Sequence, residues 1–166
     1  MRIAGFLQDS IVDGPGLRFV VFTQGCERRC DGCHNPHSLD TNGGIEITVD
    51  EVAQEMLSNP LTDGLTISGG EPFIQADESA DLAATARENG LDTWVFSGYT
   101  FEELMIRSDY DHAVKKLLDL TDILVDGPFQ QSQRTLLAKW RGSRNQRIIN
   151  VPMSLASGRA VELTID

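Results

Sequence analysis

The sequence lacks a long hydrophobic run, a secretory signal and an internal repeat. No apolar stretch approaches the roughly 18 residues that a membrane-spanning helix requires. The first ten residues, MRIAGFLQDS, do not contain the charged, apolar and small-residue regions of a signal peptide. We therefore expect a cytoplasmic protein without a membrane partner. The 166 residues are predicted to form a single domain, with a β-strand and turn segment at 1–15 and an edge strand or tail at 153–166.

Positive charge is also scarce. The chain has 14 Lys and Arg against 25 Asp and Glu, which gives a net charge of −11. General nucleic-acid binding needs a basic surface, so this balance argues against a nucleic-acid partner. The basic residues are unevenly distributed, however, because residues 127–161 contain six Lys and Arg and no Asp or Glu. This stretch is either a solvated face or a docking surface for an anionic ligand or an acidic partner.

Cysteine is scarce as well. The chain has three cysteines, and all of them lie in the segment GCERRCDGCHNP at 25–36. An odd number of thiols cannot pair completely within one chain, and a reducing cytoplasm disfavours a structural disulfide. Buried structural cysteines would be scattered through apolar strands, whereas Cys26, Cys30 and Cys33 stand among charged residues and glycine. Their crowding in a loop indicates metal or redox chemistry.

Hydrophobic patterning alternates between strands and helices. Helical segments occur at 48–59, where Thr48 and Glu51 form a capping-box pattern, at 76–89, and at 100–120 with a break near Asp109. Short β-prone runs occur at 16–25, 64–70, 92–98, 122–127 and 146–151. This rhythm predicts an α/β fold, namely an open or partial β/α barrel with about five to six mostly parallel strands.

The cysteine segment and the turn-forming segments of the sequence each follow a predicted strand. The cysteines come after 16–25, a glycine-rich turn lies at 68–72, and further turns follow at 97–99 and 126–128. In open parallel sheets, ligands bind beyond the carboxyl ends of the strands. The convergence of these segments predicts one site at that edge of the sheet.

Three thiolates can hold either zinc or an iron–sulfur cluster. A structural zinc site wants four ligands, which His34 or His37 would complete, but His34 directly follows Cys33 and the chain rarely folds back so tightly. A 4Fe–4S cluster usually takes four cysteines, so three leave one iron open for a substrate. Spacings of three and two residues let one loop reach three corners of the cube, and Gly32 eases the close approach of the backbone.

The arrangement Cys-x3-Cys-x2-Cys resembles the cluster loop of the radical S-adenosylmethionine superfamily. The segment Gly69-Gly70-Glu71-Pro72 is similar to the GGEP-type motif of the same superfamily. This resemblance implies the partial-barrel fold of those enzymes. It also implies two cofactors, a 4Fe–4S cluster with three cysteine ligands and S-adenosylmethionine, which binds the open iron through its amino and carboxylate groups.

Longer segments narrow the resemblance to the glycyl-radical-enzyme activases. DGPGLRFVVFTQGC and CDGCHNP are similar to the whole group, which includes the activators of pyruvate formate-lyase. TWVFSGYTFEEL, DILVDGPF and WRGSRNQRIINV are similar to activators of anaerobic ribonucleoside-triphosphate reductase. The implied reaction takes one electron from a low-potential donor such as flavodoxin or ferredoxin and cleaves S-adenosylmethionine. The resulting 5′-deoxyadenosyl radical removes a hydrogen atom from a glycine in the C-terminal loop of the large reductase subunit.

The resemblance also assigns expected roles to individual residues. The cluster ligands, which are also the catalytic residues, are Cys26, Cys30 and Cys33. Gly32 and His34 in the cluster loop are expected either to contact S-adenosylmethionine or to shield the cluster. The other residues expected to contact S-adenosylmethionine are Gly69, Gly70 and Glu71 at its ammonium, Ser97 and Tyr99 at its ribose, Asp126 at ribose or ammonium, and Arg147 at its carboxylate or the partner's backbone. Four of these residues also have a simpler interpretation. His34 can donate to a backbone carbonyl and Tyr99 can pack its ring, while Asp126 can form a turn and Arg147 can be solvated.

Three alternative functions stay open at this point. The chain can be an activase of another glycyl radical enzyme, of the pyruvate formate-lyase type. It can also act on a small molecule, as the 7-carboxy-7-deazaguanine synthase does. From a different class comes a non-catalytic interaction module that binds zinc or a cluster.

Overall fold

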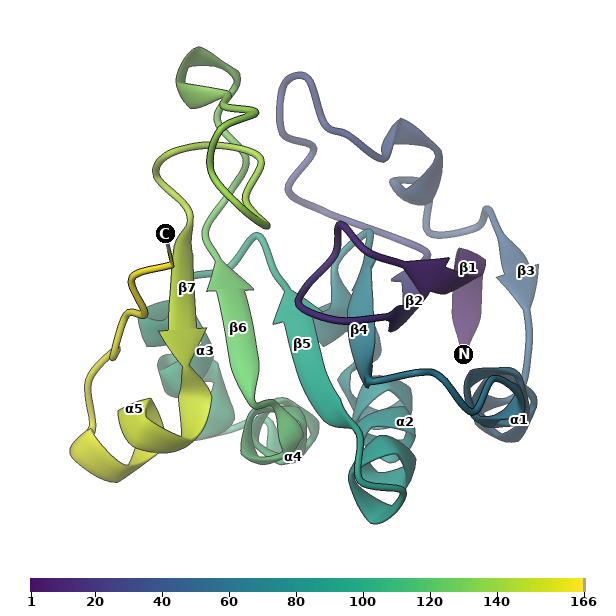
Figure 1. Cartoon of the computed structure of the whole chain (residues 1–166). Helices are drawn as coiled ribbons and strands as arrows, with labels where there is room; N and C mark the ends of the chain where they lie inside the picture. Colours follow the sequence, from purple (N-terminus) through teal and green to yellow (C-terminus); the bar gives the residue numbers. More distant parts are fainter. Residues whose placement is uncertain (166) are drawn as a thin grey trace.

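The computed structural model describes residues 1–165, so Asp166, the last residue of the predicted segment 153–166, lies outside the described residues. A seven-stranded sheet has the order β3–β1–β2–β4–β5–β6–β7 (Figure 1). Its strands are β1 Arg2–Ser10, β2 Arg18–Thr23, β3 Ile45–Glu46, β4 Gly64–Gly69, β5 Asp92–Phe96, β6 Ile123–Asp126 and β7 Arg147–Asn150. The α-helices are α1 Val49–Ser58, α2 Ala76–Glu88, α3 Phe101–Ser108, α4 His112–Leu120 and α5 Val151–Ser157, and short 3₁₀ helices lie at Pro36–Ser38, Pro72–Gln75 and Gln131–Gln133.

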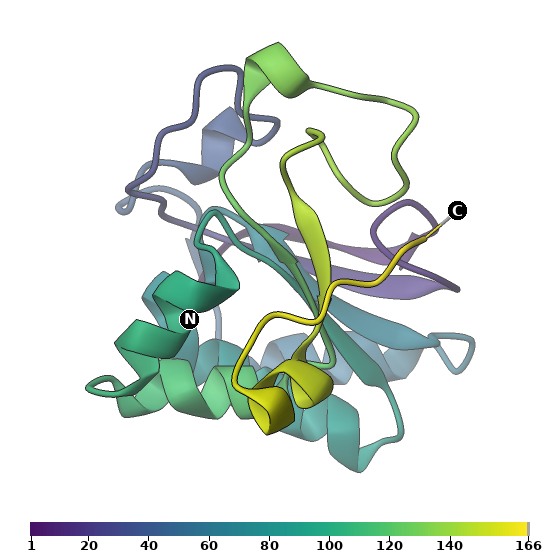
Figure 2. The same cartoon turned by 90° about the vertical axis from the view of Figure 1, so that its left-hand side faces the viewer.

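The two faces of the sheet are covered differently. Strands alternate their side chains, so Val95 on β5 packs toward the helices whereas its neighbour Trp94 points to the other face. The helices lie together on the first face, and this side holds the main core (Figures 1 and 2). On the second face Trp94, Val125 and Ile148 form a smaller cluster beneath Trp140 and the C-terminal segment. Loops rather than helices therefore cover the second face.

The predicted barrel is only partly confirmed. The fold is α/β, and its central strands β2, β4, β5 and β6 are parallel neighbours. The sheet does not close into a barrel, it has seven strands rather than five or six, and its outer strands are antiparallel. Strand β7, which corresponds to the β-prone run predicted at 146–151, runs antiparallel to β6. A parallel pair needs a crossover, usually a helix, and residues 127–146 return without an α-helix.

The predicted helix ends agree well with the structure. Thr48 caps α1 in a capping box, because its hydroxyl accepts the N–H of Glu51 at 3.2 Å and the Glu51 carboxylate accepts the N–H of Thr48 at 2.9 Å. The expected break near Asp109 separates α3 from α4, and Asp111 caps the second of these helices. Helix α5 was missed, although Asn150 caps it through the N–H of Met153 at 2.9 Å.

The C-terminal segment lies along β7. The N–H of Asn150 donates to the carbonyl of Val161 at 2.9 Å, and the N–H of Leu163 donates to the carbonyl of Ile148 at 2.7 Å. These bonds make residues 161–163 a short edge to the sheet. Within residues 1–165, each helix is too short or too polar to cross a bilayer.

Candidate functional site

A cavity of about 710 Å³ opens beyond the carboxyl ends of the parallel strands. The loop that follows β2, the turn after β4, and the segments after β5 and β6 all reach this edge of the sheet, which is uppermost in Figure 1. The sequence-predicted residues that line the cavity are Cys26, Cys30, Cys33, His34, Gly69, Gly70, Glu71 and Ser97. The edge predicted from strand order is thus hollowed and carries the three thiols.

The start of the cysteine loop is held by backbone hydrogen bonds at Gly25 and Cys26. The N–H of Gly25 donates to the carbonyl of Ser38 at 2.7 Å, and the N–H of Cys26 donates to the carbonyl of Leu39 at 3.1 Å. The three thiols are free and half-buried. Cys33 accepts the N–H of Asn35 on its sulfur at 3.4 Å, a bond suited to a thiolate.

The environment of Cys26 disfavours its charged form. Burial raises the pKa of the Cys26 thiol, and the backbone N–H groups of Arg28 and Arg29 oppose this effect. Arg29 has a φ of +46°, in the left-handed region that turns the backbone back around the sulfur. A ligating thiol must lose its proton, so an iron at this position would take over the stabilisation of the thiolate.

Gly69 and Gly70 bring the turn after β4 against the start of the cysteine loop. The N–H of Gly70 donates to the carbonyl of Thr23 at 2.7 Å, and the N–H of Glu71 donates to the carbonyl of Gly25 at 2.8 Å. A Cβ on Gly69 would overlap the backbone of Thr23, and a Cβ on Gly70 would overlap the carbonyl of Gly25. The glycines are therefore needed because two backbones touch here.

Glu71 is a buried carboxylate at the centre of this contact, with 1% of its surface exposed. Its Oε1 accepts the N–H of Phe73 at 3.2 Å and the hydroxyl of Ser97 at 2.8 Å, while its Oε2 accepts the N–H of Gly98 at 2.8 Å. Burial raises the pKa of Glu71, and these three hydrogen bonds act against that rise. A carboxylate oxygen can accept two hydrogen bonds, so Oε2 retains one acceptor position.

Arg28 is a residue of this site that sequence reasoning missed. It lines the cavity, and its guanidinium stacks 4.3 Å from the ring centroid of Tyr99 while Nη2 bonds Glu103 at 2.8 Å. Arg107 lies 4.6 Å from the same ring. The cysteine loop is thereby tied to the first turn of α3. The sequence did not distinguish Arg28 from its neighbour Arg29, which carries the same charge. The partner of Arg28, Glu103, lies 75 residues further along the chain, so no local sequence pattern indicates the ion pair.

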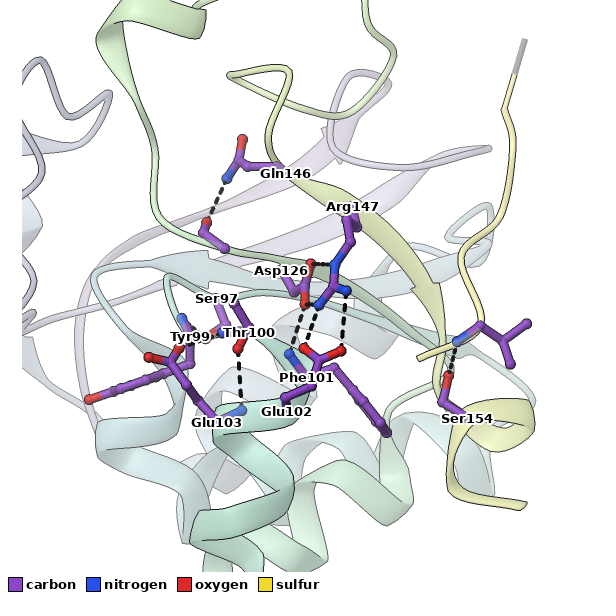
Figure 3. A network of polar contacts seen from close by, with 12 residues as sticks. Ser97, Tyr99, Thr100, Phe101, Glu102, Glu103, Asp126, Gln146, Arg147 and Ser154 are labelled. Atoms are coloured by element: carbon purple, nitrogen blue, oxygen red, sulfur yellow. Dashed lines mark hydrogen bonds and ion pairs between the residues drawn. The ribbon is translucent and has the colours of Figure 1, made fainter. Parts of the chain in front are cut away.

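Tyr99, Asp126 and Arg147 are not among the residues that line the cavity. The Asp126 carboxylate is buried and accepts Nε of Arg147 at 3.0 Å, Nη2 of Arg147 at 2.5 Å and the N–H of Phe101 at 2.7 Å (Figure 3). Arg147 also bonds Glu102 at 2.7 Å. The hydrogen bonds with Asp126 and then Glu102 raise the pKa of Arg147, and the bond with Arg147 lowers the pKa of Glu102. This network joins the start of α3 to β6 and β7.

His34 and Gly32 face the segment that follows β6. The His34 ring lies 4.6 Å from the ring of Phe129, at an interplanar angle of 51°. Gly32 has a φ of +71°, and a Cβ there would lie 3.0 Å from the Gln131 side chain. The cysteine loop thus packs against residues 127–146, so both walls of the cavity are built from irregular chain.

Comparison with known proteins identifies the relatives of this architecture. A sequence profile of the 4Fe-4S single cluster domain matches residues 12–149. The chain is 36% identical over 151 residues to the anaerobic ribonucleoside-triphosphate reductase-activating protein of Vibrio cholerae, covering 83% of this chain and 90% of that protein. For the protein of the same name from Haemophilus influenzae, the identity is 32% over 158 residues, with coverages of 89% and 97%.

The chain belongs to the radical S-adenosylmethionine activase family. It is also 35% identical over 129 residues to the pyruvate formate-lyase 1-activating enzyme of Escherichia coli K12, and there it spans 50% of the relative's length. Residues 12–149 of this family member therefore form a 4Fe–4S single cluster domain.

The donor set of this chain fits the 4Fe–4S cluster of the domain family that it matches. Among residues 1–165, no three His, Cys, Asp or Glu side chains converge closely enough to hold one metal ion. A cubane does not require that convergence, because each thiolate binds a different iron. Three half-buried thiols share one cavity here, and the backbone N–H of Asn35 already points at one of the sulfurs. Such sulfur-directed hydrogen bonds tune bound clusters.

Proposed function

We propose that this activase binds S-adenosylmethionine beside its cluster and generates a glycyl radical on anaerobic ribonucleoside-triphosphate reductase. The observation that carries the proposal is the single cavity that brings the three thiols together with the Gly69-Gly70-Glu71 turn. The choice of partner is supported by alignments of 151 and 158 residues with reductase activators, against 129 with pyruvate formate-lyase activators.

The residues of the cavity have distinct parts in this proposal. Cys26, Cys30 and Cys33 would hold three irons of the cluster, and the fourth iron would remain open for the amino and carboxylate groups of S-adenosylmethionine. When bound and reduced, the cluster would supply the electron for cleavage of S-adenosylmethionine, the chemistry by which a glycyl radical would be formed on the partner. The electron comes from a low-potential protein donor such as flavodoxin or ferredoxin.

Glu71 would accept the ammonium of S-adenosylmethionine through the remaining acceptor position on Oε2. Its other bonds hold the carboxylate still, which favours a fixed orientation of the ligand. Ser97 donates to Glu71 and accepts the N–H of Tyr99 at 3.0 Å, so one hydroxyl lone pair remains for a ribose hydroxyl. Gly32 and His34 would shield the cluster on the side of residues 127–146.

Tyr99, Asp126 and Arg147 have a supporting part in this proposal. Tyr99 stacks against Arg28, and Asp126 accepts the N–H of Phe101 and pairs with Arg147, so these contacts fix the start of α3 beside the site. We assign direct ligand contacts to Glu71 and Ser97 in their place. Two neighbours of the network, Gly127 and Gln146, do line the cavity.

The test is glycyl radical formation on a purified partner. The protein is reconstituted with iron and sulfide without oxygen, reduced, and mixed with S-adenosylmethionine and the reductase. A glycyl doublet in the electron paramagnetic resonance spectrum, with one 5′-deoxyadenosine per radical, is the expected result. The same assay with pyruvate formate-lyase tests the second candidate, which the 35% identity to its activators favours. A doublet on the lyase and none on the reductase would overturn the choice of partner.

A metal analysis tests the class of protein. Zinc bound in a one-to-one ratio, with no iron retained after reconstitution and no 5′-deoxyadenosine formed, would refute the enzymatic proposal. An interaction module that holds a metal through the three cysteines would then be the better explanation. The expected result is close to four irons and four sulfides per chain, the content of one cubane.

A further inference from the structure

Residues 133–144 form a hairpin at the mouth of the cavity, and we call it the 133–144 hairpin. Arg134 and Ser143 make an antiparallel bridge, and the N–H of Thr135 donates to the carbonyl of Gly142 at 3.1 Å. The N–H of Arg144 donates to the carbonyl of Gln133 at 2.9 Å. Figures 1 and 2 show this segment projecting beyond the carboxyl end of β6. The hairpin is thus an ordered projection of the chain.

The base of the hairpin is anchored on the sheet. The Trp140 ring meets Trp94 edge-on at 5.1 Å between centroids, and Trp94 is 3% exposed. The side-chain carbonyl of Gln146 accepts the N–H groups of Gly142 at 2.9 Å and Ser143 at 3.1 Å. Its amide donates to the carbonyl of Gly127 at 3.1 Å. A projection held in this way is preorganised, and it loses little conformational freedom when a partner binds.

The tip of the hairpin is apolar and solvent-exposed. Leu136 and Leu137 are 86% and 93% exposed, and Leu136 lines the cavity that contains the cysteines. The loop after β1 adds Ile11 and Val12, which are 74% and 71% exposed, and Val12 lines the same cavity. Single exposed leucines are ordinary, but two exposed apolar pairs, each with one member in the cavity lining, indicate an interaction surface.

The hairpin is also the basic part of an acidic protein. It carries Arg134, Lys139, Arg141 and Arg144, and residues 127–161 contain no Asp or Glu, although the whole chain has a net charge of −11. Arg134 and Arg144 are exposed. A basic surface with apolar anchors fits a partner segment that combines acidic and apolar side chains.

We propose that the 133–144 hairpin is the docking element for the reductase, with Leu137 inserted into an apolar pocket of an acidic segment beside the target glycine. This inference rests on the proposed function and specifies its partner surface. A second copy of this chain fits less well. A two-fold dimer through the hairpin would set basic residues against basic residues, and a head-to-tail contact would produce a ring or an open filament rather than a dimer.

The decisive variant is Leu137→Ser, with Leu61→Ser as its matched control. Leu61 is 72% exposed and precedes β4 at the opposite end of the strands, so the two substitutions make the same change in the same kind of environment. Leu137 is not among the cavity-lining residues, so L137S should bind S-adenosylmethionine as the wild type does. We expect L137S to weaken equilibrium binding to the reductase about 10- to 100-fold, as burial of one anchor leucine implies. L61S should bind like the wild type.

A charge-reversed variant tests the electrostatic half of the proposal. Arg134→Glu with Arg144→Glu should weaken reductase binding about tenfold or more at low ionic strength, and high salt should reduce the difference from the wild type. Unchanged binding in this variant and in L137S would overturn the docking inference. So would a wild-type dimer that L137S dissociates, because the occupant would then be a second copy.

The two proposals fail in distinguishable ways. If the wild type neither binds the reductase nor forms its glycyl doublet, the proposed function is wrong. If the wild type does both, and L137S and the charge-reversed variant each bind with wild-type affinity, the function stands and the hairpin is not the docking element. Binding is measured with labelled reductase in the absence of turnover, so the result does not depend on activity of the reconstituted enzyme.

Discussion

Replacement of Glu71 by glutamine separates ligand binding from folding. The substitution keeps the size of the side chain and one carbonyl oxygen, which can still accept from Phe73 and Ser97. It replaces Oε2 by an amide NH₂, which then faces the N–H of Gly98. The ammonium of S-adenosylmethionine would meet a donor where the wild type offers an acceptor. We therefore expect Glu71→Gln to fold and to bind the ligand poorly.

The expected size of the effect follows from the lost bond. A hydrogen bond to a charged group contributes about 1.5–3 kcal/mol, which corresponds to a roughly 10- to 150-fold rise in the dissociation constant. Stability should respond differently. Burial raises the pKa of Glu71 in the folded protein above its unfolded value of about 4.3. Its contribution to stability is therefore fully present below that unfolded value and is lost as pH rises through the folded pKa.

The assay combines binding with denaturation. Calorimetric titration of S-adenosylmethionine into the reconstituted protein measures the dissociation constant, and urea denaturation of the cluster-free protein at several pH values measures stability. The loss of stability with rising pH should be smaller in E71Q than in the wild type. Glu88→Gln, an exposed glutamate at the end of α2, is the control for the same chemical change. Wild-type affinity in E71Q would refute the assignment of the ammonium to Glu71.

Three further predictions concern the cluster and its supports. Cys33→Ser should lose most of the iron retained after reconstitution, and wild-type iron content would exclude Cys33 as a ligand. Arg147→Met leaves the buried Asp126 without its cation and should lower the free energy of unfolding by about 3 kcal/mol. Glu102→Gln removes the exposed partner of the same arginine and should lower it by less than about 1 kcal/mol. Equal losses in urea denaturation would contradict the stronger role assigned to the Asp126–Arg147 pair. Gly70→Ala should destabilise by about 1–3 kcal/mol, because its Cβ overlaps the carbonyl of Gly25, and an unchanged denaturation midpoint would show that the contact is not tight.

Local patterns predicted the local features of this fold. The capping box at Thr48, the break near Asp109 and the position of each central strand along the sequence depend on residues close together in the chain. Helix α5 also had a readable signal, since Asn150 is followed by Pro152 and Gly158 ends the helix with a φ of +71°. The sequence prediction missed α5 because it assigned Asn150, the N-cap residue, and Val151, the first residue of the helix, to the β-prone run at 146–151.

Features that depend on residues far apart in the chain could not be predicted from local sequence patterns. The direction of β7 depends on how residues 127–146 return, and the sequence of that loop does not state its path. Arg28 and Glu103 are 75 residues apart, so their pairing depends on the completed fold. The thiols and the Gly69-Gly70-Glu71 turn were expected at one edge because parallel strands share that edge. The structure brings them around one cavity, and their ligand roles remain predictions.

Because β7 returns antiparallel beside β6, the length of the loop at 127–146 can change without moving the other strands of the sheet. Residues 127–146 leave the sheet after β6 and re-enter it beside the same strand, so their length does not constrain the position of the other strands. Doubling the length of such a loop changes its closure entropy by only about 0.6 kcal/mol. Insertions, deletions and substitutions at the tip would leave the cysteine loop and the Gly69-Gly70-Glu71 turn undisturbed. If the 133–144 hairpin docks the partner as proposed, changes at its tip would alter the choice of partner without rebuilding the site at the cysteines.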